Sequence, residues 1–307
     1  MKIITYVIVT WNNQNQIKAC IDSIKNNTSI SFDIFIIDNN SSDKTCEIIK
    51  KYFPDVILFR NVENLGFAKG NNLALKYVKS EYICFINPDI ILTEDIVSPS
   101  INILNKEKSV GLVASRLCNL DGSHQPSCFA FATPFSLFCE ILHIGKIMPQ
   151  FICKKYFPNF YHAKKSFFPP WVIGAEMVMR TYEAKKINGF STEYYMYTED
   201  MDLCKKIQYI LHKKIYFSAN YSLIHLGGMS EQQNNNYNKQ KKLFANDIFF
   251  INRFYGNKKS FKALKFMMRA YMIRLFILRL AYRHADRTKQ INKTQNSIKM
   301  LRELKKC

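Results

Sequence analysis

Three acidic residues, Glu199, Asp200 and Asp202, lie within four positions and follow an aromatic run that ends at Tyr197. A carboxylate beside aromatic walls can act as a general base that takes a proton from an acceptor hydroxyl. The alternative is structural, because acidic residues in the first turn of a helix complement its dipole. The aromatic run favours an enclosed site over an open surface, so the general base is the stronger interpretation.

Another carboxylate, Asp89, follows the apolar run Tyr82–Ile86 within the sequence Asn87-Pro88-Asp89. Mg²⁺ and similar hard cations prefer oxygen ligands, and they often take only one or two carboxylates together with substrate phosphates. A divalent ion held against a diphosphate is therefore one interpretation. A turn that ends a strand is the other, because Asn-Pro and Pro-Asp are common turn dipeptides.

Two further groups have the chemistry to bind a nucleotide. Asp38 ends the apolar run Phe32–Asp38, where a carboxylate can accept hydrogen bonds from a base or a ribose, although the polar residues after it also favour an Asx turn. Gly66 and Gly70 surround a predicted helix start, where backbone can approach a phosphate and the helix N-terminus favours an anion. A tight turn before a core helix explains the same glycines, so each signal is weak by itself.

His225 ends an apolar run and precedes Gly227 and Gly228, which suggests a loop that closes over a ligand. A lone histidine is nevertheless more often a structural residue than a functional one. The spacing around His225 alone therefore leaves both interpretations open.

These groups follow segments that alternate between strand and helix character. Apolar, β-branched runs predict strands, and apolar residues at helical spacing predict helices. The predicted strands are Ile3–Thr10, Phe32–Asp38, Val56–Arg60, Tyr82–Ile86, Trp171–Arg180 and Tyr221–His225, and the predicted helices are Gln14–Lys25, Asp43–Tyr52, Phe67–Val78 and Asp200–Leu211. The aromatic, proline-rich residues 118–170 give no clear prediction, and Glu231–Lys242 is predicted to be a polar loop.

Continuous apolar strands between helices indicate an α/β fold with a mainly parallel central sheet that helices cover on both faces. Ligands of such sheets bind beyond the carboxyl ends of the strands. We therefore expect a ligand site among the polar residues that follow the first four predicted strands, which are Trp11–Asn13, Asp38–Asp43, Asn61–Gly66 and Asn87–Asp89.

The chain has 307 residues, of which 48% are hydrophobic, so it can bury a large core. Its net charge of +20 is uneven, since residues 258–307 contain fifteen Lys and Arg against two acids and so carry +13 of it. This tail is predicted to be helical, with one basic stripe and apolar residues over the rest. The basic stripe contains Lys262, Lys265, Arg269, Arg279, Arg283 and Arg287. Such a helix suits an anionic membrane interface, and packing on the catalytic domain or on a partner is the alternative.

Nine cysteines, an odd number without a Cys-x-x-Cys pair or zinc-site spacing, predict free thiols in a reducing compartment. No apolar run reaches the roughly 18 residues that a membrane span requires. We expect a cytoplasmic protein that is peripheral at the inner face of the cell membrane. A nucleic-acid-binding protein is disfavoured, because the charge lies in the tail and no helix-turn-helix, zinc finger or RNP signature occurs.

Seven runs in order resemble the inverting family 2 glycosyltransferases of the bacterial rhamnosyltransferase-like branch. They are VIVTWNN, IFIIDNNSSDKT, NLGFAKGNN, FINPDI, VIGAEMVMR, GFSTEYYMYTEDMDLC and HLGGMS. The resemblance implies a GT-A fold over residues 1–257, with a nucleotide-binding half at 1–115 and an acceptor half at 116–257, followed by the basic amphipathic helical tail at 258–307. It also implies metal-dependent transfer of a sugar from a nucleotide diphosphate to an acceptor hydroxyl in cell-surface polysaccharide synthesis.

The resemblance carries roles to matching residues of this chain. Nucleotide and donor contacts would come from Thr10, Asp38, Asn64, Gly66, Asn71 and Asn87. Asp89 and His225 would hold Mg²⁺ or Mn²⁺, and Asp200 would be the base with Glu199 beside it. Asp202 and Trp171 would lie on the side of a glycan or lipid-linked glycan acceptor. dTDP-rhamnose is the first donor to consider, and UDP-galactofuranose and other UDP-hexoses remain alternatives.

Three positions depart from the family pattern. Asn87 replaces the first Asp of the Asp-x-Asp site, Gly189–Thr192 replaces Gly-Phe-Asp-Glu, and Lys206 stands where an Arg is common and can equally be a surface charge. A nucleotide-sugar pyrophosphorylase is disfavoured, because Trp11–Gln14 is not the Gly-rich basic loop that such enzymes have after the first strand. A protein that binds without catalysis is the remaining alternative, although the candidate base and metal ligands are present.

Overall fold

The computed structural model describes residues 2–161, 163–194, 198–227, 236–280 and 287–305. The chain divides into two compact units, each made of two stretches. Unit 1 contains Met1–Phe129 and His162–Ser230, and unit 2 contains Ala130–Tyr161 and Glu231–Cys307. Neither division falls at the predicted boundary after residue 257, which stays a prediction.

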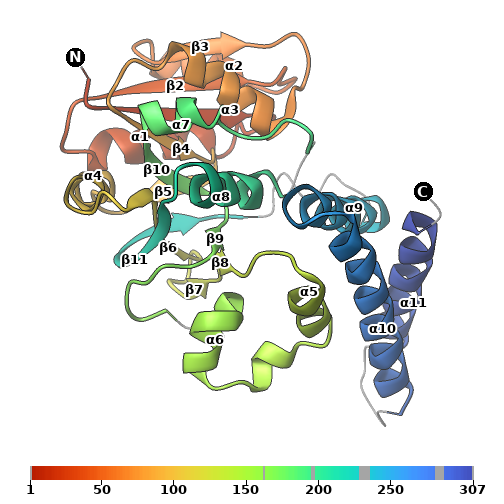
Figure 1. Cartoon of the computed structure of the whole chain (residues 1–307). Helices are drawn as coiled ribbons and strands as arrows, with labels where there is room; N and C mark the ends of the chain where they lie inside the picture. The colour runs from red at the N-terminus through yellow and green to blue at the C-terminus, as the bar shows by residue number, and fades with distance from the viewer. Residues whose placement is uncertain (1, 162, 195–197, 228–235, 281–286, 306–307) are drawn as a thin grey trace. The chain divides into compact units, whose positions relative to one another are not determined.

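Unit 1 is built on a nine-stranded sheet with the order β3-β2-β1-β4-β10-β6-β11-β5, and β7 pairs with β6 (Figure 1). The strands are β1 (Ile4–Thr10), β2 (Phe32–Asp38), β3 (Ile57–Arg60), β4 (Tyr82–Ile86), β5 (Ile90–Leu92), β6 (Val110–Cys118), β7 (His124–Gln125), β10 (Glu176–Arg180) and β11 (Lys214–His225). β1 pairs in parallel with β2 and β4, whereas β10 runs antiparallel to β4 and β6. The predicted α/β class with a mainly parallel sheet is confirmed.

The strands point alternate side chains to opposite faces of the sheet, and helices cover both faces. On one face Ile4, Tyr6 and Ile8 share a buried core with residues of α1 (Ile17–Asn27), α2 (Thr45–Tyr52) and α4 (Val97–Lys106). On the other face α3 (Gly66–Tyr77) packs on β1 and β2. The approach is close there, because a Cβ added at Gly70 would lie 2.9 Å from Cγ1 of Val9.

Two predicted segments differ from the structure. The predicted strand Trp171–Arg180 is interrupted, since β9 (Trp171–Val172) pairs with β8 (Cys128–Phe129) and only β10 joins the main sheet. The predicted loop Glu231–Lys242 is helical from Asn236, where α9 (Asn236–Tyr255) begins, and residues 231–235 lie outside the described residues. Buried aromatic side chains further along α9, such as Phe244 and Phe250, stabilise a helix whose polar first turns have little preference of their own.

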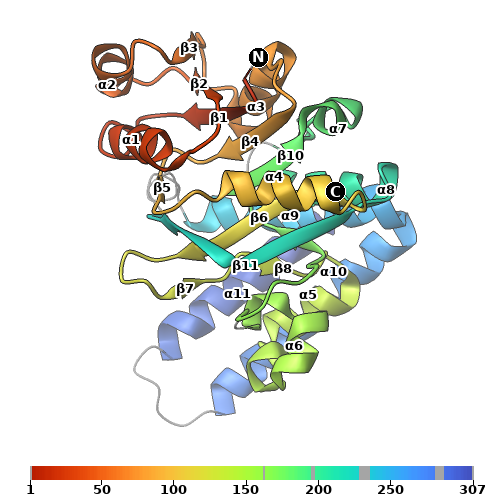
Figure 2. The same ribbon diagram turned by 90° about the vertical axis from the view of Figure 1, so that its left-hand side faces the viewer.

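Unit 2 is helical and contains α5 (Pro134–Ile141), α6 (Gln150–Tyr156), α9, α10 (Asn257–Leu280) and α11 (Arg287–Leu304). α10 packs on α5, α9 and α11, and both views show α5 beside α10 (Figures 1 and 2). The tail is therefore helical as predicted, but as two helices, and Arg283 of the predicted basic stripe lies outside the described residues. Within the described ranges, no helix is long and apolar enough to cross a membrane.

All eight cysteines that the structure describes are free, and Cys307 lies outside the described residues. The thiols are spread over both units, and seven of the eight are buried. Their positions are those of small apolar side chains in a core.

Glu176 is a buried carboxyl near the centre of the sheet. Its Oε2 accepts a hydrogen bond of 2.7 Å from the backbone nitrogen of Ser115, whereas Oε1 has no partner among the described residues. β10 and β6 pair only at Val178–Val113 and Met179–Leu112. Continued by two positions, this register sets Ser115 opposite Glu176, where the backbone nitrogen of Ser115 bonds the carboxyl of Glu176. Burial raises the pKa of Glu176 to about 7.

We predict that Glu176→Gln flattens the dependence of stability on pH. A carboxyl whose pKa is raised on folding keeps its proton in the folded state, so the free energy of unfolding falls as pH rises from about 4.5 to about 7. A shift of this size corresponds to roughly 3 kcal/mol, and the neutral Gln side chain does not contribute it. Urea unfolding at about pH 5 and about pH 8 measures the difference. Parallel pH profiles for the two proteins would contradict the assignment.

Candidate functional site

Asp38 ends β2 and is completely buried. Its Oδ2 accepts a hydrogen bond of 3.1 Å from the backbone of Ser41 and lies 3.9 Å from Nε of Arg60, while Oδ1 has no partner among the described residues. The parallel register places Thr10, at the end of β1, directly beside Asp38. A buried carboxylate oxygen without a donor is costly, so the geometry suits a ligand that supplies one, such as a nucleoside base or a ribose hydroxyl.

The start of α3 is fastened to the end of β2. Gly66 has a φ of 77°, a left-handed conformation that favours glycine, and its N–H donates to Oδ1 of Asn64 at 2.9 Å. Its carbonyl accepts a hydrogen bond of 3.2 Å from Nδ2 of Asn39, the residue that follows Asp38. Asn64 and Gly66 are thereby linked to the Asp38 turn. Asn39 was not among the predicted site residues, although it stands in the polar run after the strand.

Asn71 takes a different position from the other predicted nucleotide contacts. Its side chain is buried, and its amide donates a hydrogen bond of 3.0 Å to the carbonyl of Phe67 within α3. This bond supports the first turns of the helix. A direct donor contact by Asn71 stays a prediction.

Asp89 and His225 come together at the ends of β4 and β11. Nε2 of His225 lies 3.5 Å from Oδ1 of Asp89, and the backbone nitrogen of Leu226 donates to the carbonyl of Asp89 at 3.0 Å. On the opposite side of the ring, Nδ1 of His225 lies 2.7 Å from Oε1 of Gln125. Since an amide oxygen only accepts, Nδ1 donates in this contact, and the neutral ring in that tautomer would have the lone pair of Nε2 on the side of Asp89, available to a metal ion.

A carboxylate and an imidazole with a free lone pair form a donor set that fits a divalent cation such as Mn²⁺. Within the described part of the chain, no group of three or more His, Cys, Asp or Glu could surround an ion. A cation held by Asp89 and His225 would therefore take its remaining ligands from phosphate oxygens and water. Gln125 would orient His225 from behind, as residues behind metal ligands commonly do.

Asp200 lies in the first turn of α8 (Glu199–Ile210). Its Oδ2 accepts a hydrogen bond of 3.0 Å from the N–H of Gly174, and its Oδ1 accepts one of 2.8 Å from the N–H of Met201. Desolvation raises the pKa of Asp200 above its ordinary value despite these two bonds. A fixed carboxylate with a raised pKa is suited to accept a proton near neutral pH.

A two-residue segment connects this carboxylate to the turn that holds Asp89. Gly174 binds Asp200, and the carbonyl of the next residue, Ala175, accepts a hydrogen bond of 3.0 Å from the N–H of Asn87. Asn87 opens the Asn87–Asp89 turn, so one short stretch of backbone sets the positions of the candidate base and of the candidate metal ligand.

The remaining predicted residues belong to α8, which contains Asp200, or to β9, which contacts α8. Glu199 is buried, and Asp202 is completely buried with its carboxylate bonded to the hydroxyls of Ser191 and Tyr194. That position favours a supporting role for Asp202, and its contact with an acceptor stays a prediction. Trp171 stacks on Phe129 with 4.9 Å between ring centroids and is only partly buried.

Two of the departures from the family pattern have structural explanations. Lys206 is not a surface charge, because it is buried and its ammonium donates to the carbonyl of Gly189. The turn at Gly189 is also held by Asn72 of α3, whose amide bonds both the N–H and the carbonyl of Phe190, at 2.8 and 2.7 Å. Sequence reasoning missed Asn72, because a helix surface position gives no sign of a partner 118 residues away.

Parts of the predicted site lie outside the described residues. The aromatic residues Tyr195–Tyr197 before Glu199 and residues 228–230 of the run after His225 are among them. The predicted enclosing aromatic wall and the closing glycine loop stay predictions.

The chain is similar to known glycosyltransferases. Rhamnosyltransferase WbbL of Escherichia coli is 26% identical over 234 residues, which cover 71% of this chain and 81% of WbbL. A poly(ribitol-phosphate) β-glucosyltransferase of Bacillus spizizenii is 27% identical over 210 residues, which cover 65% of this chain but only 32% of that enzyme.

Among solved structures, a mannosyltransferase from Pyrobaculum calidifontis in complex with GDP-Man and Mn²⁺ superposes with a TM-score of 0.58. Its identity is 10%, and the match covers 97% of this chain and 86% of the mannosyltransferase. This similarity concerns the fold alone, and it confirms the predicted GT-A architecture. Residues 5–156 match the family model described as Glycosyl transferase family 2. This part of the chain is a glycosyl transferase family 2 domain, and the protein is a glycosyltransferase.

Proposed function

We propose that this enzyme transfers a sugar from a nucleotide diphosphate to an acceptor hydroxyl with inversion at the anomeric carbon, in the synthesis of a cell-surface polysaccharide. One observation carries the proposal: Gly174 and Ala175 fasten the Asp200 carboxylate and the Asn87–Asp89 turn through consecutive backbone groups. The arrangement supports a base and a diphosphate site that face one sugar. In such an arrangement a single in-line displacement needs no protein nucleophile.

In this mechanism Asp200 takes the proton of the acceptor hydroxyl as the acceptor oxygen bonds to the anomeric carbon. The bond from that carbon to the diphosphate oxygen breaks, and the nucleoside diphosphate leaves with its electron pair. The hydrogen bond from Gly174 keeps the carboxylate oriented, and its raised pKa brings it closer to neutral pH. A divalent cation on Asp89 and His225 would neutralise charge on the diphosphate.

We propose rhamnose from dTDP-rhamnose as the donor sugar, and the similarity to WbbL supports this choice. A UDP-hexose, including UDP-galactofuranose, is the alternative, and the glucosyltransferase relative supports a hexose donor. In either case the donor contains a nucleoside diphosphate. Oδ1 of Asp38, which has no hydrogen-bond partner among the described residues, can accept a hydrogen bond from its nucleoside.

We further propose that the tail brings the enzyme to the cytoplasmic face of a membrane, where a lipid-linked glycan is the acceptor. The charge supports this, since residues 258–307 carry fifteen Lys and Arg against two acids. Each basic residue close to an anionic bilayer contributes about 1 kcal/mol to binding. The exposed apolar side chains near the end of α10 add a surface that can enter the interface.

The first test is a thermal-shift panel with dTDP, UDP and GDP, each with and without Mn²⁺. We expect one nucleotide to raise the melting temperature, and to do so only with the ion, because a ligand of the native state stabilises it by mass action. Asp89→Ala should abolish this shift, while Asp22→Ala, an exposed change on α1, should keep it. The proposal is wrong if no nucleotide shifts the melting temperature under any condition.

We predict that Asp200→Asn lowers turnover by about 10²–10⁴-fold, because the amide cannot accept the hydroxyl proton. Nucleotide binding should stay nearly unchanged, since the amide oxygen can still accept the hydrogen bond from Gly174. Turnover is measured by release of the nucleoside diphosphate, and Glu193→Gln, an exposed change nearby, is the matched control. An equal loss of nucleotide affinity in Asp200→Asn would assign the residue to the donor site instead.

We predict that Gln125→Leu weakens Mn²⁺ affinity by about 10–100-fold, because His225 loses the acceptor that fixes its ring and its tautomer. Gln125→Glu keeps an oxygen acceptor at the same position and should retain most of the affinity. Calorimetric titration of Mn²⁺ in the presence of the nucleotide measures both variants without any turnover. Unchanged affinity in Gln125→Leu would show that the ring needs no support from this side.

A further inference from the structure

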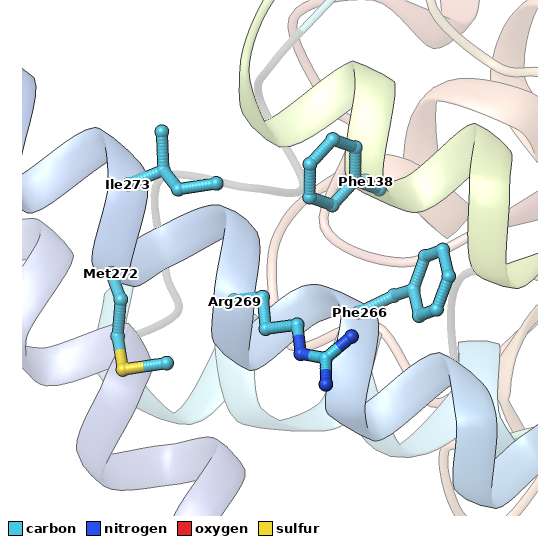
Figure 3. Close-up of a pocket in the computed structure, with 5 residues that line it drawn as sticks. All are labelled: Phe138, Phe266, Arg269, Met272 and Ile273. Atoms are coloured by element: carbon cyan, nitrogen blue, oxygen red, sulfur yellow. The ribbon is translucent and has the colours of Figure 1, made fainter.

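Unit 2 contains a hollow between α5 and α10 that the sugar-transfer chemistry does not use. Its volume is about 420 Å³, within the range of small-ligand sites. Phe138 of α5 lines it together with four side chains of α10, as Figure 3 shows: Phe266, Arg269, Met272 and Ile273. The guanidinium of Arg269 is the one charged group among these lining side chains, all of which lie in the described part of the chain.

The two helices that form the hollow are fastened to each other. The rings of Phe138 and Phe266 meet edge to face with 5.9 Å between centroids. Arg274, the residue after Ile273, donates a hydrogen bond of 3.0 Å to the carbonyl of Ile141, at the C-terminal end of α5. The hollow is therefore formed before any ligand arrives, which lowers the cost of binding.

The exposed surface of α10 changes character along the helix, and the hollow lies at the change. Before it, Lys262 and Lys265 are exposed at helical spacing from Arg269, beside one exposed aromatic residue, Phe261. After it come Phe276, Ile277 and Leu280, which are 63%, 54% and 67% exposed, beside one exposed basic residue, Arg279. A basic stretch followed by large exposed apolar side chains is the pattern of a helix that meets the headgroups and then the hydrocarbon of a bilayer.

Arg269 itself is exposed and has no hydrogen-bond or ion-pair partner among the described residues. The apolar walls around it offer no group that could bind a sugar or a nucleotide base by hydrogen bonds. An apolar hollow with one cation at its edge instead complements a hydrocarbon chain that ends in an anionic group. Arginine in particular matches the oxygens of a phosphate.

We propose that this hollow holds a hydrocarbon chain of an anionic phospholipid, with the lipid phosphate at Arg269. The proposal deepens the proposed membrane partner of the tail, and it adds a specific lipid-binding site to what was a general attraction of charges. It does not depend on the identity of the donor sugar.

The test uses the full chain and a short-chain phosphatidylglycerol, dihexanoylphosphatidylglycerol, kept monomeric in solution and titrated by calorimetry. Ile273→Asp puts a carboxylate into the hollow beside Arg269, and we expect it to weaken binding by about tenfold or more. Ile147→Asp is the matched control, because it makes the same change at an isoleucine of unit 2 that does not line the hollow. Both isoleucines are exposed, so neither change should unfold the protein.

Two further titrations separate the sources of the interaction. Dihexanoylphosphatidylcholine should bind more weakly than the anionic lipid, and inorganic phosphate alone should not bind measurably. The proposal is overturned if Ile273→Asp keeps wild-type affinity, if Ile147→Asp loses as much affinity as Ile273→Asp, or if phosphate binds as well as the lipid. Association of the protein with itself that competes with the lipid would assign the hollow to a second copy of the chain.

The same samples report separately on sugar transfer. The nucleotide-dependent thermal shift depends on residues of unit 1, so Ile273→Asp should keep it. A wild-type protein that binds the lipid but shows no nucleotide shift would sink the proposed transferase site and leave the lipid site standing. If the wild type and all variants fail to bind the lipid while the nucleotide-dependent thermal shift stays intact, the lipid site is wrong and the transferase site stands.

Discussion

The interruption between β9 and β10 is the constraint on which the site depends. Residues 173–175 pair with none of the strands that the structure describes, so their backbone groups must find other partners. Ile173 donates to the carbonyl of Ser127, Gly174 donates to Asp200, and Ala175 accepts from Asn87. Three consecutive residues thus form hydrogen bonds to three different segments. In a continuous strand the same backbone N–H and C=O groups would pair with the neighbouring strands instead.

The close packing around this interruption makes it rigid. A Cβ at Gly174 would lie 3.3 Å from Cζ of Phe67 and 3.5 Å from Cβ of Asp200, so there is little room for the segment to move. Phe67 is the second residue of α3. It follows Gly66, whose carbonyl accepts the hydrogen bond from the side chain of Asn39. The turn after β2, the start of α3 and the start of α8 are in this way parts of one packed arrangement.

Two buried carboxylate oxygens, Oδ1 of Asp38 and Oε1 of Glu176, have no hydrogen-bond partner among the described residues. Asp38 ends a strand, where a ligand can supply the missing donor. Glu176 is 1% exposed within the sheet, and its carboxyl keeps its proton up to about pH 7 instead. A buried carboxylate without a donor at a functional site lowers the stability of the free protein, and a bound substrate that donates a hydrogen bond restores it. A carboxyl buried in the core instead stays protonated, because burial disfavours its charged form.

The sequence predicts well those features that depend on local patterns. Apolar runs between helices predicted the parallel strands, and the rule that ligands bind beyond strand ends pointed to the turns that contain Asp38 and Asp89. The pairing of Thr10 with Asp38 and of Asp89 with His225 was expected only from the family resemblance, and the structure places the members of each pair side by side. The features it missed depend on contacts between distant residues. Gln125 belongs to a two-residue strand 100 residues before His225, and Lys206 is buried by a turn at Gly189 that helical periodicity does not show. The interruption at residues 173–175 was missed because the run from Trp171 to Arg180 is mostly apolar, and Gly174 by itself does not mark a break in a strand.

Unit 2 is assembled from two stretches of the chain, and this has a consequence for how the protein is made. α5 packs on α10, but α10 follows it only after the second half of unit 1 has been synthesised. At about 5–20 residues per second, a ribosome needs on the order of 10 s to produce the chain between them. During that interval the apolar side of α5, including Leu137 and Phe138, has no α10 to cover it. The nascent chain therefore presents an aromatic surface to the chaperones of the cell until the last helices emerge, and a ribosome that stalls before α10 leaves that surface open.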